Sequence, residues 1–440
     1  MHYLILGAGV SGKAAEKLLL AEGADVSIAP KTENGAAVER FAAQQSTLHT
    51  PHSTLTLVVS PGIAPSDPEI VRAKELGMNV IGEMQLGVSR FNGRVIAITG
   101  SKGKSSLVKL ISDTLNLGGA PRAIPCGNYG AAMCAVAAMR PQPEFAVVEC
   151  SSFQLEYGAL ERGADAALIL NLSPDHLDRH KTMEAYGEAK LNIFENMSRG
   201  ALRLLPAPEH GATNAALNAA LRRRFAERFG APAAQPSAES QRFAETIFGT
   251  YFGNEILRPA ACAAYEILRF FGLSIEEIDA GFRTFEPLPH RMQKVAEYGG
   301  VVFIDDSKAT SLAAMAAAVK MSAKPVFLIA GGRLKEIVET DGRDLVELGL
   351  TNAYLIGECA EEMRSAWRES FPTEISGEMK AAVRAAFADA LKAGGGTVLL
   401  SPGTASFDQF KDYKARGDAF AEAAIYYARE ARESQRSNIK

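Results

Sequence analysis

Residues 99–106 combine glycines, lysines and hydroxyl side chains in a pattern suited to binding phosphate. They follow an apolar run at residues 94–98, which predicts a strand, and they precede a predicted helix. In that setting backbone N–H groups and the positive end of a helix surround phosphate oxygens. We expect Lys104 to neutralise nucleotide phosphates and Ser105 to hold Mg²⁺. Ile98 occupies the position at which the usual phosphate-loop pattern has its first glycine, so the match is to a shortened variant. The alternative is a turn that happens to contain lysine.

A second glycine turn, with Gly7, Gly9 and Gly12, follows the apolar run at residues 3–6. The spacing matches the dinucleotide fingerprint and raises a dehydrogenase as one alternative. A ribose-binding acid should follow about twenty residues later, but residues 30–32 are Pro, Lys and Thr. We therefore expect a phosphate-bearing substrate on this turn, and not a nicotinamide cofactor. A tight packing turn is the other alternative.

Carboxylates follow two more apolar runs, at the strand ends where α/β sheets bind ligands. Glu149 ends the run at residues 145–149, and a carboxylate there suits the hard Mg²⁺ ion. A solvated acid is the alternative. The run at residues 166–172 leads to His176 and His180, two of the seven histidines, beside two aspartates. This stretch predicts a second metal or phosphate site, or else a loop in which an Asp caps a helix.

Basic and hydroxyl residues also lie beside apolar runs in the last third of the chain. The sequence places them at residues 290–291, 305–310, 330–335 and 400–406. Such groups at strand ends suit the recognition of carboxylates. Solvated loops are the alternative for each.

The elements that must position these groups are strands that alternate with helices, which indicates an α/β protein with mostly parallel sheets. We expect strands near residues 3–6, 26–29, 55–60, 79–81, 94–98, 145–149, 166–172, 301–304, 326–330, 353–356 and 397–400. The pattern restarts twice, which predicts domains at residues 1–92, 93–287 and 288–440. Residues 207–244 predict a surface insertion with one helix at 222–229, and residues 415–434 predict an exposed amphipathic helix.

Length and composition limit the possible functions. A chain of 440 residues is long enough for about three domains. Its formal charge of -4 provides no global positive field for a nucleic-acid backbone. The five cysteines are scattered and odd in number, which indicates reduced thiols. We see no leader segment and no apolar run long enough to span a membrane, so we expect a cytoplasmic location.

Together these segments resemble the Mur ligases, most closely those that join D-glutamate to UDP-N-acetylmuramoyl-L-alanine in peptidoglycan synthesis. The resemblance covers residues 7–421 except 207–244, and residues 306–310 and 401–410 discriminate best. It implies a Rossmann-like N-terminal domain for the UDP-sugar, a central P-loop ATPase domain, and a Rossmann-like C-terminal domain for the amino acid. It also implies that ATP phosphorylates the alanyl carboxylate, after which the D-glutamate amine attacks the acyl phosphate and releases phosphate.

The resemblance further implies roles for individual residues at matching positions. ATP would contact Gly100, Ser101, Lys102, Gly103, Lys104, Ser105, Ser106, Arg291 and Asp306. The UDP-sugar would contact Val10, Ser11, Ser60, Gly62, Asn128 and His176. The D-glutamate would contact Thr310, Lys335, Ser406 and Tyr413.

Two Mg²⁺ ions and three catalytic residues also follow from the resemblance. Ser105 and Glu149 would hold one ion, and His176 with a carbamylated Lys190 the other. A carbamate turns an amine into an oxygen ligand and removes its positive charge, so a lysine can then stand beside a metal. The catalytic residues would be Lys104, His176 and Lys190.

The remaining expectations concern partners and departures from the family pattern. We expect small-molecule substrates, no nucleic-acid or membrane partner, and a monomer. The departures are Lys102, where the family usually has Asn, and residues 30–32, 254–258 and 333–334. A ligase with another amino acid or acyl acceptor, and a non-catalytic nucleotide-binding relative, are the alternatives.

Overall fold

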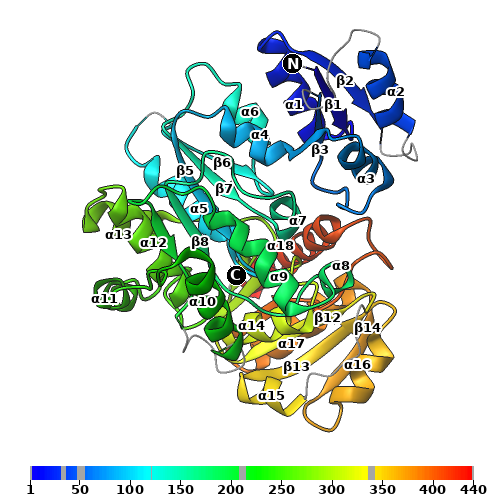
Figure 1. Cartoon of the computed structure of the whole chain (residues 1–440). Coiled ribbons are helices and arrows are strands. Elements are labelled where there is room, and N and C mark those ends of the chain that lie inside the picture. Colours follow the sequence, from blue (N-terminus) through cyan, green and yellow to red (C-terminus); the bar gives the residue numbers. More distant parts are fainter. Residues whose placement is uncertain are drawn as a thin grey trace. The chain divides into compact units, whose positions relative to one another are not determined.

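The structure, a computed structural model, describes residues 2–30, 36–46, 55–119, 121–207, 215–334 and 342–438. The chain divides into two compact units, Met1–Phe285 and Glu286–Lys440. The first unit contains two sheets and the second contains one (Figure 1). The expected α/β class with mostly parallel sheets is confirmed, because β10–β11 is the one antiparallel pair among the named strands of the described ranges. The boundary between residues 92 and 93 stays a prediction.

The N-terminal sheet has the strand order β2-β1-β3-β4. Its strands are β1 (His2–Leu6), β2 (Asp25–Ala29), β3 (Leu55–Val59) and β4 (Asn79–Gly82). The helices of this part are α1 (Val10–Ala21), α2 (Ala36–Ser46), α3 (Pro68–Glu75) and α4 (Glu83–Ser89). All four strands begin or end within one residue of the predicted runs. The glycine turn connects β1 to α1, so its backbone lies at the carboxyl edge of the sheet.

The central sheet has the order β6-β7-β5-β8-β9, with β5 in the middle. Its strands are β5 (Arg94–Thr99), β6 (Ala123–Gly127), β7 (Phe145–Glu149), β8 (Ala166–Ile169) and β9 (Leu202–Leu204). Its helices include α5 (Lys104–Leu115), α6 (Met133–Ala137), α7 (Ser152–Leu155), α8 (Leu177–His180), α9 (Met183–Leu191), α12 (Arg258–Phe270) and α13 (Ile275–Thr284). Because β7 and β8 both flank β5, the loops that follow these three strands lie side by side.

Two apolar cores enclose the central sheet. One core contains α5, α12 and α13 residues together with Ile96, Ile98 and Val147. The other joins alternate residues of the same strands, such as Val95 and Ala97, to side chains of the N-terminal sheet and of α1, α4, α6 and α9. The two sheets of the first unit therefore share a continuous buried core.

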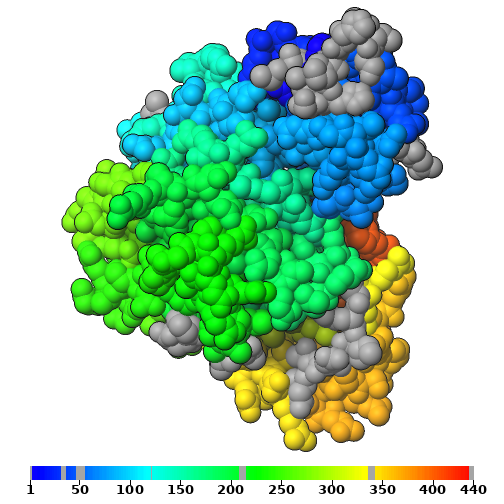
Figure 2. Space-filling model, in the orientation of Figure 1, coloured from blue at the N-terminus to red at the C-terminus, as the bar shows by residue number. Residues whose placement is uncertain are grey.

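Residues 207–244 are more than the single helix at a surface insertion that the sequence predicts. They contain α10 (Ala215–Phe229) and most of α11 (Ala238–Thr246), and Ala234 forms a backbone bridge to Leu204 of β9. Leu221 and Phe225 of α10 are buried in the core, and the Phe225 ring lies 5.0 Å from that of Phe194. The exposed side of α10 forms part of the bright green surface in Figure 2. Residues of this segment are therefore part of the same apolar core as the buried residues of α9.

The second unit has a six-stranded sheet of order β10-β11-β15-β12-β13-β14. Its strands are β10 (Gln293–Tyr298), β11 (Val301–Asp305), β12 (Val326–Gly331), β13 (Leu350–Ile356), β14 (Thr373–Gly377) and β15 (Gly396–Leu400). Its helices are α14 (Leu312–Met321), α15 (Gly342–Glu347), α16 (Ala360–Trp367), α17 (Met379–Lys392) and α18 (Tyr413–Asn438). Separate apolar cores contain α17 and α18 on one side and α14 and α16 on the other. Within the described ranges, no helix combines the length and apolar character needed to cross a membrane.

Candidate active site

The phosphate loop connects β5 to α5, as the sequence predicts. Gly100 and Gly103 have φ of 149° and 83°, a backbone region in which a side chain is strained. A Cβ on Gly100 would also lie 3.2 Å from the Asn171 nitrogen. The Lys104 Nζ donates to the carbonyls of Gly100 and Ser101 at 2.9 and 3.1 Å. The lysine is thereby held against the loop that is proposed to bind phosphate.

Two residues outside the predicted set hold this loop in shape. The Asn171 Oδ1 accepts from the backbone N–H groups of Ser101 and Lys102 at 3.0 and 2.9 Å, and its Nδ2 donates to the Lys102 carbonyl. The hydroxyls of Ser101 and Tyr186 lie 3.2 Å apart. Asn171 follows the apolar run of β8, but its contact with the loop requires β8 beside β5, a pairing that the sequence does not reveal.

Glu149 lies at the end of β7 with only 2% of its surface exposed. Its Oε1 accepts a hydrogen bond of 2.6 Å from the Asn128 amide. Its Oε2 is buried without a hydrogen-bond partner in the described part of the chain. A buried carboxylate oxygen without a donor fits a cation, because burial without compensation is costly. Together with Ser105, which begins α5 after the adjacent strand β5, this oxygen suits Mg²⁺.

Lys190 lies on α9 with 1% of its surface exposed. Its Nζ donates to Thr99 Oγ1 and to the Gly100 carbonyl at 3.3 and 3.0 Å, and it lies 4.4 Å from the centre of the Tyr186 ring. Burial, and then the positive charge of Lys104, hold the pKa of Lys190 well below its usual value. The fold therefore places this amine directly beneath the phosphate loop and favours its neutral form.

Lys102 and His176 both approach Asp175, which lies in the loop that follows β8. His176 has φ of 54°, its side chain is about half exposed, and its ring centre lies 4.8 Å from that of Phe153. Lys102 forms an ion pair of 3.1 Å with Asp175, the residue before His176. This pair lowers the pKa of Asp175 against the opposing effect of partial burial. Lys102 thus joins the phosphate loop to the histidine loop. The described structure has no hydrogen bond from Lys190 to His176, so the second Mg²⁺ site stays a prediction.

No cluster of three or more His, Cys, Asp and Glu side chains in the described ranges is arranged as a metal site. This observation leaves the proposed Mg²⁺ sites open, because each contains only one such residue, Glu149 or His176. Their remaining ligands would be the Ser105 hydroxyl and a modified Lys190.

The glycine turn of the N-terminal sheet opens into a cavity of about 400 Å³. The four residues predicted there, Val10, Ser11, Ser60 and Gly62, all line it. A Cβ on Gly7 would lie 2.7 Å from the Ser60 hydroxyl, so the glycine permits close approach of the two loops. Lys31 and Thr32 lie outside the described residues. The structure therefore brings the proposed UDP-sugar contacts of this sheet together.

The wall of this cavity is joined to the histidine loop through one carbonyl. The Ile63 carbonyl accepts hydrogen bonds from Tyr157 at 2.5 Å and from Arg179 at 3.2 Å. Arg179 also forms an ion pair of 2.5 Å with Glu156, and its guanidinium lies 4.2 Å from the centre of the Phe153 ring. The side chains that contact His176 are thus connected to the N-terminal cavity.

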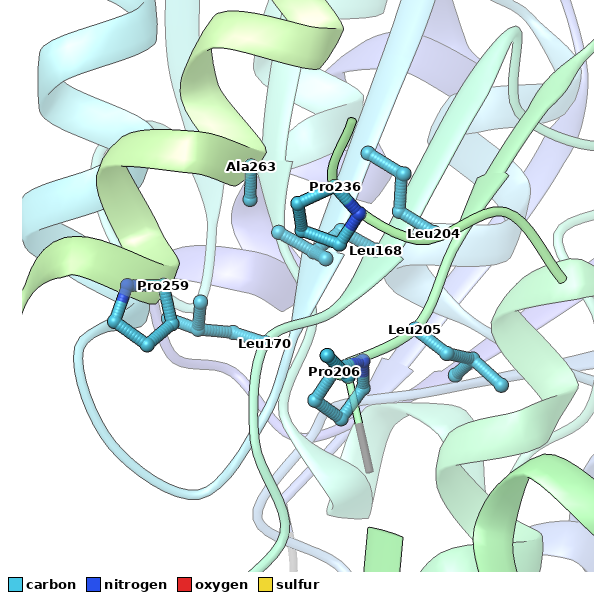
Figure 3. Close-up of a pocket in the computed structure, with 9 residues that line it drawn as sticks. Leu168, Leu170, Leu204, Leu205, Pro206, Pro236, Pro259 and Ala263 are labelled. Carbon is cyan, nitrogen blue, oxygen red and sulfur yellow. The ribbon is translucent and has the colours of Figure 1, made fainter. Parts of the chain in front are cut away.

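Residues 254–258, one of the departures from the family pattern, lie at the turn that leads into α12. The Asn254 side chain donates to the Tyr251 carbonyl and accepts from the Leu257 N–H, so it shapes the turn before α12. Nearby, Leu170, Pro206 and Pro259 line an apolar cavity of only about 10 Å³ (Figure 3). A gap of that size accommodates about one water molecule and is a packing defect, not a ligand site.

In the second unit, Thr310 follows β11, Ser406 follows β15 and Tyr413 begins α18. These are three of the four predicted amino-acid contacts. Ser406 is buried, and the Lys308 Nζ lies 4.0 Å from the centre of the Tyr413 ring. The Gly403 N–H donates to the Ala309 carbonyl at 3.0 Å, which brings the loop of Thr310 beside the loop of Ser406. Lys335 lies outside the described residues.

The loop after β11 also contains a buried acid, Asp306. It accepts from the Ser401 hydroxyl at 3.0 Å and from the Met292 N–H at 3.2 Å. Burial raises its pKa to about 7, against the lowering effect of these two hydrogen bonds and of the Arg291 charge. The neighbouring Asp305 is also buried, its pKa is raised, and it lies 2.7 Å from His290.

The raised pKa of Asp306 predicts that the second unit loses stability as the pH rises from about 4 to about 7. The folded form holds this proton more tightly than the unfolded form does, so stability falls through that window and is constant above it. Asp306→Asn should reduce the fall in the free energy of unfolding per pH unit between about pH 4 and pH 7. The single tryptophan, Trp367, is buried in this unit and reports its unfolding by fluorescence in urea. Equal slopes in both proteins would contradict the prediction.

Comparison with known proteins shows the family to which the chain belongs. Residues 98–252 match the Mur ligase middle domain. A UDP-N-acetylmuramoylalanine–D-glutamate ligase from Caulobacter vibrioides is 34% identical, and the match covers 95% of this chain and 94% of that one. One from Rubrobacter xylanophilus is 35% identical, with coverage of 96% and 97%.

Solved structures support the fold. MurF from Acinetobacter baumannii superposes with a TM-score of 0.55 at 15% identity, covering 86% of this chain and 92% of its own. MurC from Thermotoga maritima superposes with a TM-score of 0.51 at 14% identity, covering 97% and 100%.

A phosphate loop on a parallel sheet, with a buried acid and a buried lysine beside it, defines a nucleotide-binding α/β protein. The chain belongs to the Mur ligase family, in the branch of the UDP-N-acetylmuramoylalanine–D-glutamate ligases.

Proposed function

We propose that this protein is an ATP-dependent ligase that joins D-glutamate to UDP-N-acetylmuramoyl-L-alanine in peptidoglycan synthesis. The observation that carries the proposal is the convergence of Lys104, Lys190 and Glu149 around one phosphate loop. These side chains come from α5, α9 and β7. A carboxylate that holds Mg²⁺ also suits simple nucleotide binding, but a protein that only bound a nucleotide would have no need to bury an amine of lowered pKa there.

Each residue has a defined task in the proposed reaction. The loop of residues 100–106 and Lys104 would bind the ATP phosphates and offset the negative charge that moves with the transferred phosphoryl group. His176 and Asn128 would orient the alanyl carboxylate that accepts it. The cavity at Ser60 would hold the UDP-sugar. The resulting acyl phosphate would then be attacked by the D-glutamate amine, and its collapse would release phosphate.

Mg²⁺ would be held by Ser105 and Glu149, and a second ion by His176 with carbamylated Lys190. When bound, Mg²⁺ supplies positive charge that stabilises the phosphates during transfer. The lowered pKa of Lys190 supports carbamylation, because the lone pair of a neutral amine attacks CO₂ and the product releases one proton. The roles of Arg291 and Asp306 as nucleotide contacts, and of Thr310, Ser406, Tyr413 and Lys335 as D-glutamate contacts, are part of the same proposal.

The decisive experiment measures phosphate release from ATP and Mg²⁺ with UDP-N-acetylmuramoyl-L-alanine. Reactions with D-glutamate, with L-glutamate and without an amino acid are compared. Release that depends on D-glutamate is expected. Release without an amino acid, or none under any condition, would move the assignment to another acceptor or to a non-catalytic nucleotide-binding protein.

The buried oxygen of Glu149 predicts that Glu149→Gln weakens Mg²⁺ binding. The amide keeps the shape and the contact with Asn128 but loses the charge, so we expect the affinity to fall at least about tenfold. Calorimetric titration of Mg²⁺ into the ADP complex measures the effect. Glu144→Gln is the matched control, because Glu144 precedes the same strand and pairs with Arg122 at the surface. Equal Mg²⁺ affinities in the two variants would exclude Glu149 as a ligand.

A further inference from the structure

Arg416 is a buried cation that the proposed mechanism does not use. It lies in the first turn of α18 with 1% of its surface exposed. Its Nε donates to the Ser307 hydroxyl, and its Nη2 donates to the carbonyls of Ser307 and Thr404, each at 3.0 Å. The Ser307 hydroxyl in turn donates to the Tyr413 carbonyl at 2.8 Å. One guanidinium therefore joins the start of α18 to the loops after β11 and β15.

These segments are the ones that contain the proposed amino-acid contacts. Thr310 follows Ser307 by three residues, Ser406 follows Thr404 by two, and Tyr413 begins α18. The turn after β12 is connected to the same group through Ala405, the residue after Thr404. Ala405 and Arg333 exchange two backbone hydrogen bonds of 2.9 and 3.0 Å.

The turn after β12 packs tightly against the same group. Gly332 has φ of 137°, and a Cβ there would lie 2.6 Å from Thr404 Oγ1 and 3.2 Å from the Arg416 Nη1. Arg416 thus lies at the point where all four segments meet.

Stability alone does not explain a charged side chain at this place. Removing a cation from water is costly, and apolar side chains of similar volume often replace buried ion pairs without loss of stability. Moreover, Arg416 Nη1 and Thr404 Oγ1 have no hydrogen-bond partner within the described residues. Burial lowers the pKa of Arg416 to about 10, so the group keeps its charge at neutral pH. What the guanidinium provides is a planar fork that fixes oxygens of separate segments at set distances.

We propose that Arg416 is a positioning residue for the amino-acid site. By holding the loops of Thr310 and Ser406 against the start of α18, it sets the spacing of the groups that receive the two carboxylates of the acceptor. The inference rests on the proposed function, because it takes D-glutamate as the ligand of these loops.

The test compares the KM values of the three substrates in Arg416→Lys and Ser307→Ala. Lysine keeps the charge but lacks the fork, so we expect the KM for D-glutamate to rise about tenfold or more, since small displacements of binding groups are costly. The KM values for ATP and for the UDP-sugar should change less than about twofold. Ser307→Ala removes only the hydroxyl that links Arg416 to Tyr413, and it should shift the same KM by a smaller factor.

Tyr354→Phe is the matched control for lost stability in the same unit. The buried Tyr354 hydroxyl donates to Asp389 at 2.7 Å, and the residue lies in the middle of β13. Removal of this hydroxyl should lower the urea concentration at the midpoint of unfolding, measured by Trp367 fluorescence, without changing the KM for D-glutamate.

Three outcomes decide between the proposals. An unchanged KM for D-glutamate in Arg416→Lys, or an equal rise in all three KM values, would overturn the positioning role. If Arg416→Lys does not fold, Ser307→Ala decides by the same criterion. Absence of D-glutamate-dependent phosphate release by the unmodified protein would instead overturn the proposed function itself.

Discussion

Lys190→Ala should lower turnover by at least about 100-fold while the chain still folds. Losing one group that stabilises a charged transition state has an effect of this size. The lysine is buried, and its Nζ donates to the Thr99 hydroxyl and to the Gly100 carbonyl, so its loss removes a group held against the loop that is proposed to bind the ATP phosphates. Steady-state phosphate release measures the effect, and the far-ultraviolet circular dichroism spectrum checks the fold.

The proposed carbamate on Lys190 predicts that short carboxylic acids rescue the Lys190→Ala variant. If the functional group is a carboxylate on the lysine nitrogen, short carboxylic acids should enter the vacated space in Lys190→Ala and partly restore activity. Lys181→Ala is the control, because Lys181 is exposed and its Nζ contacts only the Asp178 carbonyl among the described hydrogen bonds. Turnover at the unmodified rate in Lys190→Ala would refute a catalytic role for this residue.

Lys104→Ala should abolish ATP turnover. Its amine is held at the phosphate loop by the carbonyls of Gly100 and Ser101, at the positive end of α5. Removing it leaves the phosphates without the cation that offsets their charge, and both binding and transfer depend on that cation. Phosphate release and the binding of a fluorescent ATP analogue are the two measurements.

Lys109→Ala on the same helix is the control for Lys104→Ala. Lys109 forms an ion pair of 2.5 Å with Asp113 and lies 5.0 Å from the centre of the Phe285 ring, all within the first unit. We expect its ATP turnover to stay within about twofold of the unmodified protein, as is usual for a surface ion pair of small energy. Retained ATP turnover in Lys104→Ala would refute the assignment of the phosphate loop.

Sequence alone predicted the features that short segments encode. The turn between β5 and α5 and the glycine turn between β1 and α1 lie where the sequence placed them, because glycines and strand-forming residues act over a few positions. Glu149 was placed at its strand end for the same reason. Four of the described strands were missed because none has a clear apolar run. Pro125 interrupts β6, β9 has three residues, and β10 and β14 have no buried side chain. These segments become strands because they pair with a neighbouring strand in the sheet.

Tertiary structure alone decided which distant residues meet. The order β7-β5-β8 brings Asn171 onto the phosphate loop and places Glu149 beside it, and the packing of α9 delivers Lys190 below the same loop. Likewise, the contacts of Arg416 with Ser307 and Thr404 join segments about a hundred and about a dozen residues away in the chain. Such contacts depend on strand order and buried packing, which are properties of the whole fold. Local residue patterns therefore determine the chemistry that is available, while the packing of the sheets determines which groups share one site.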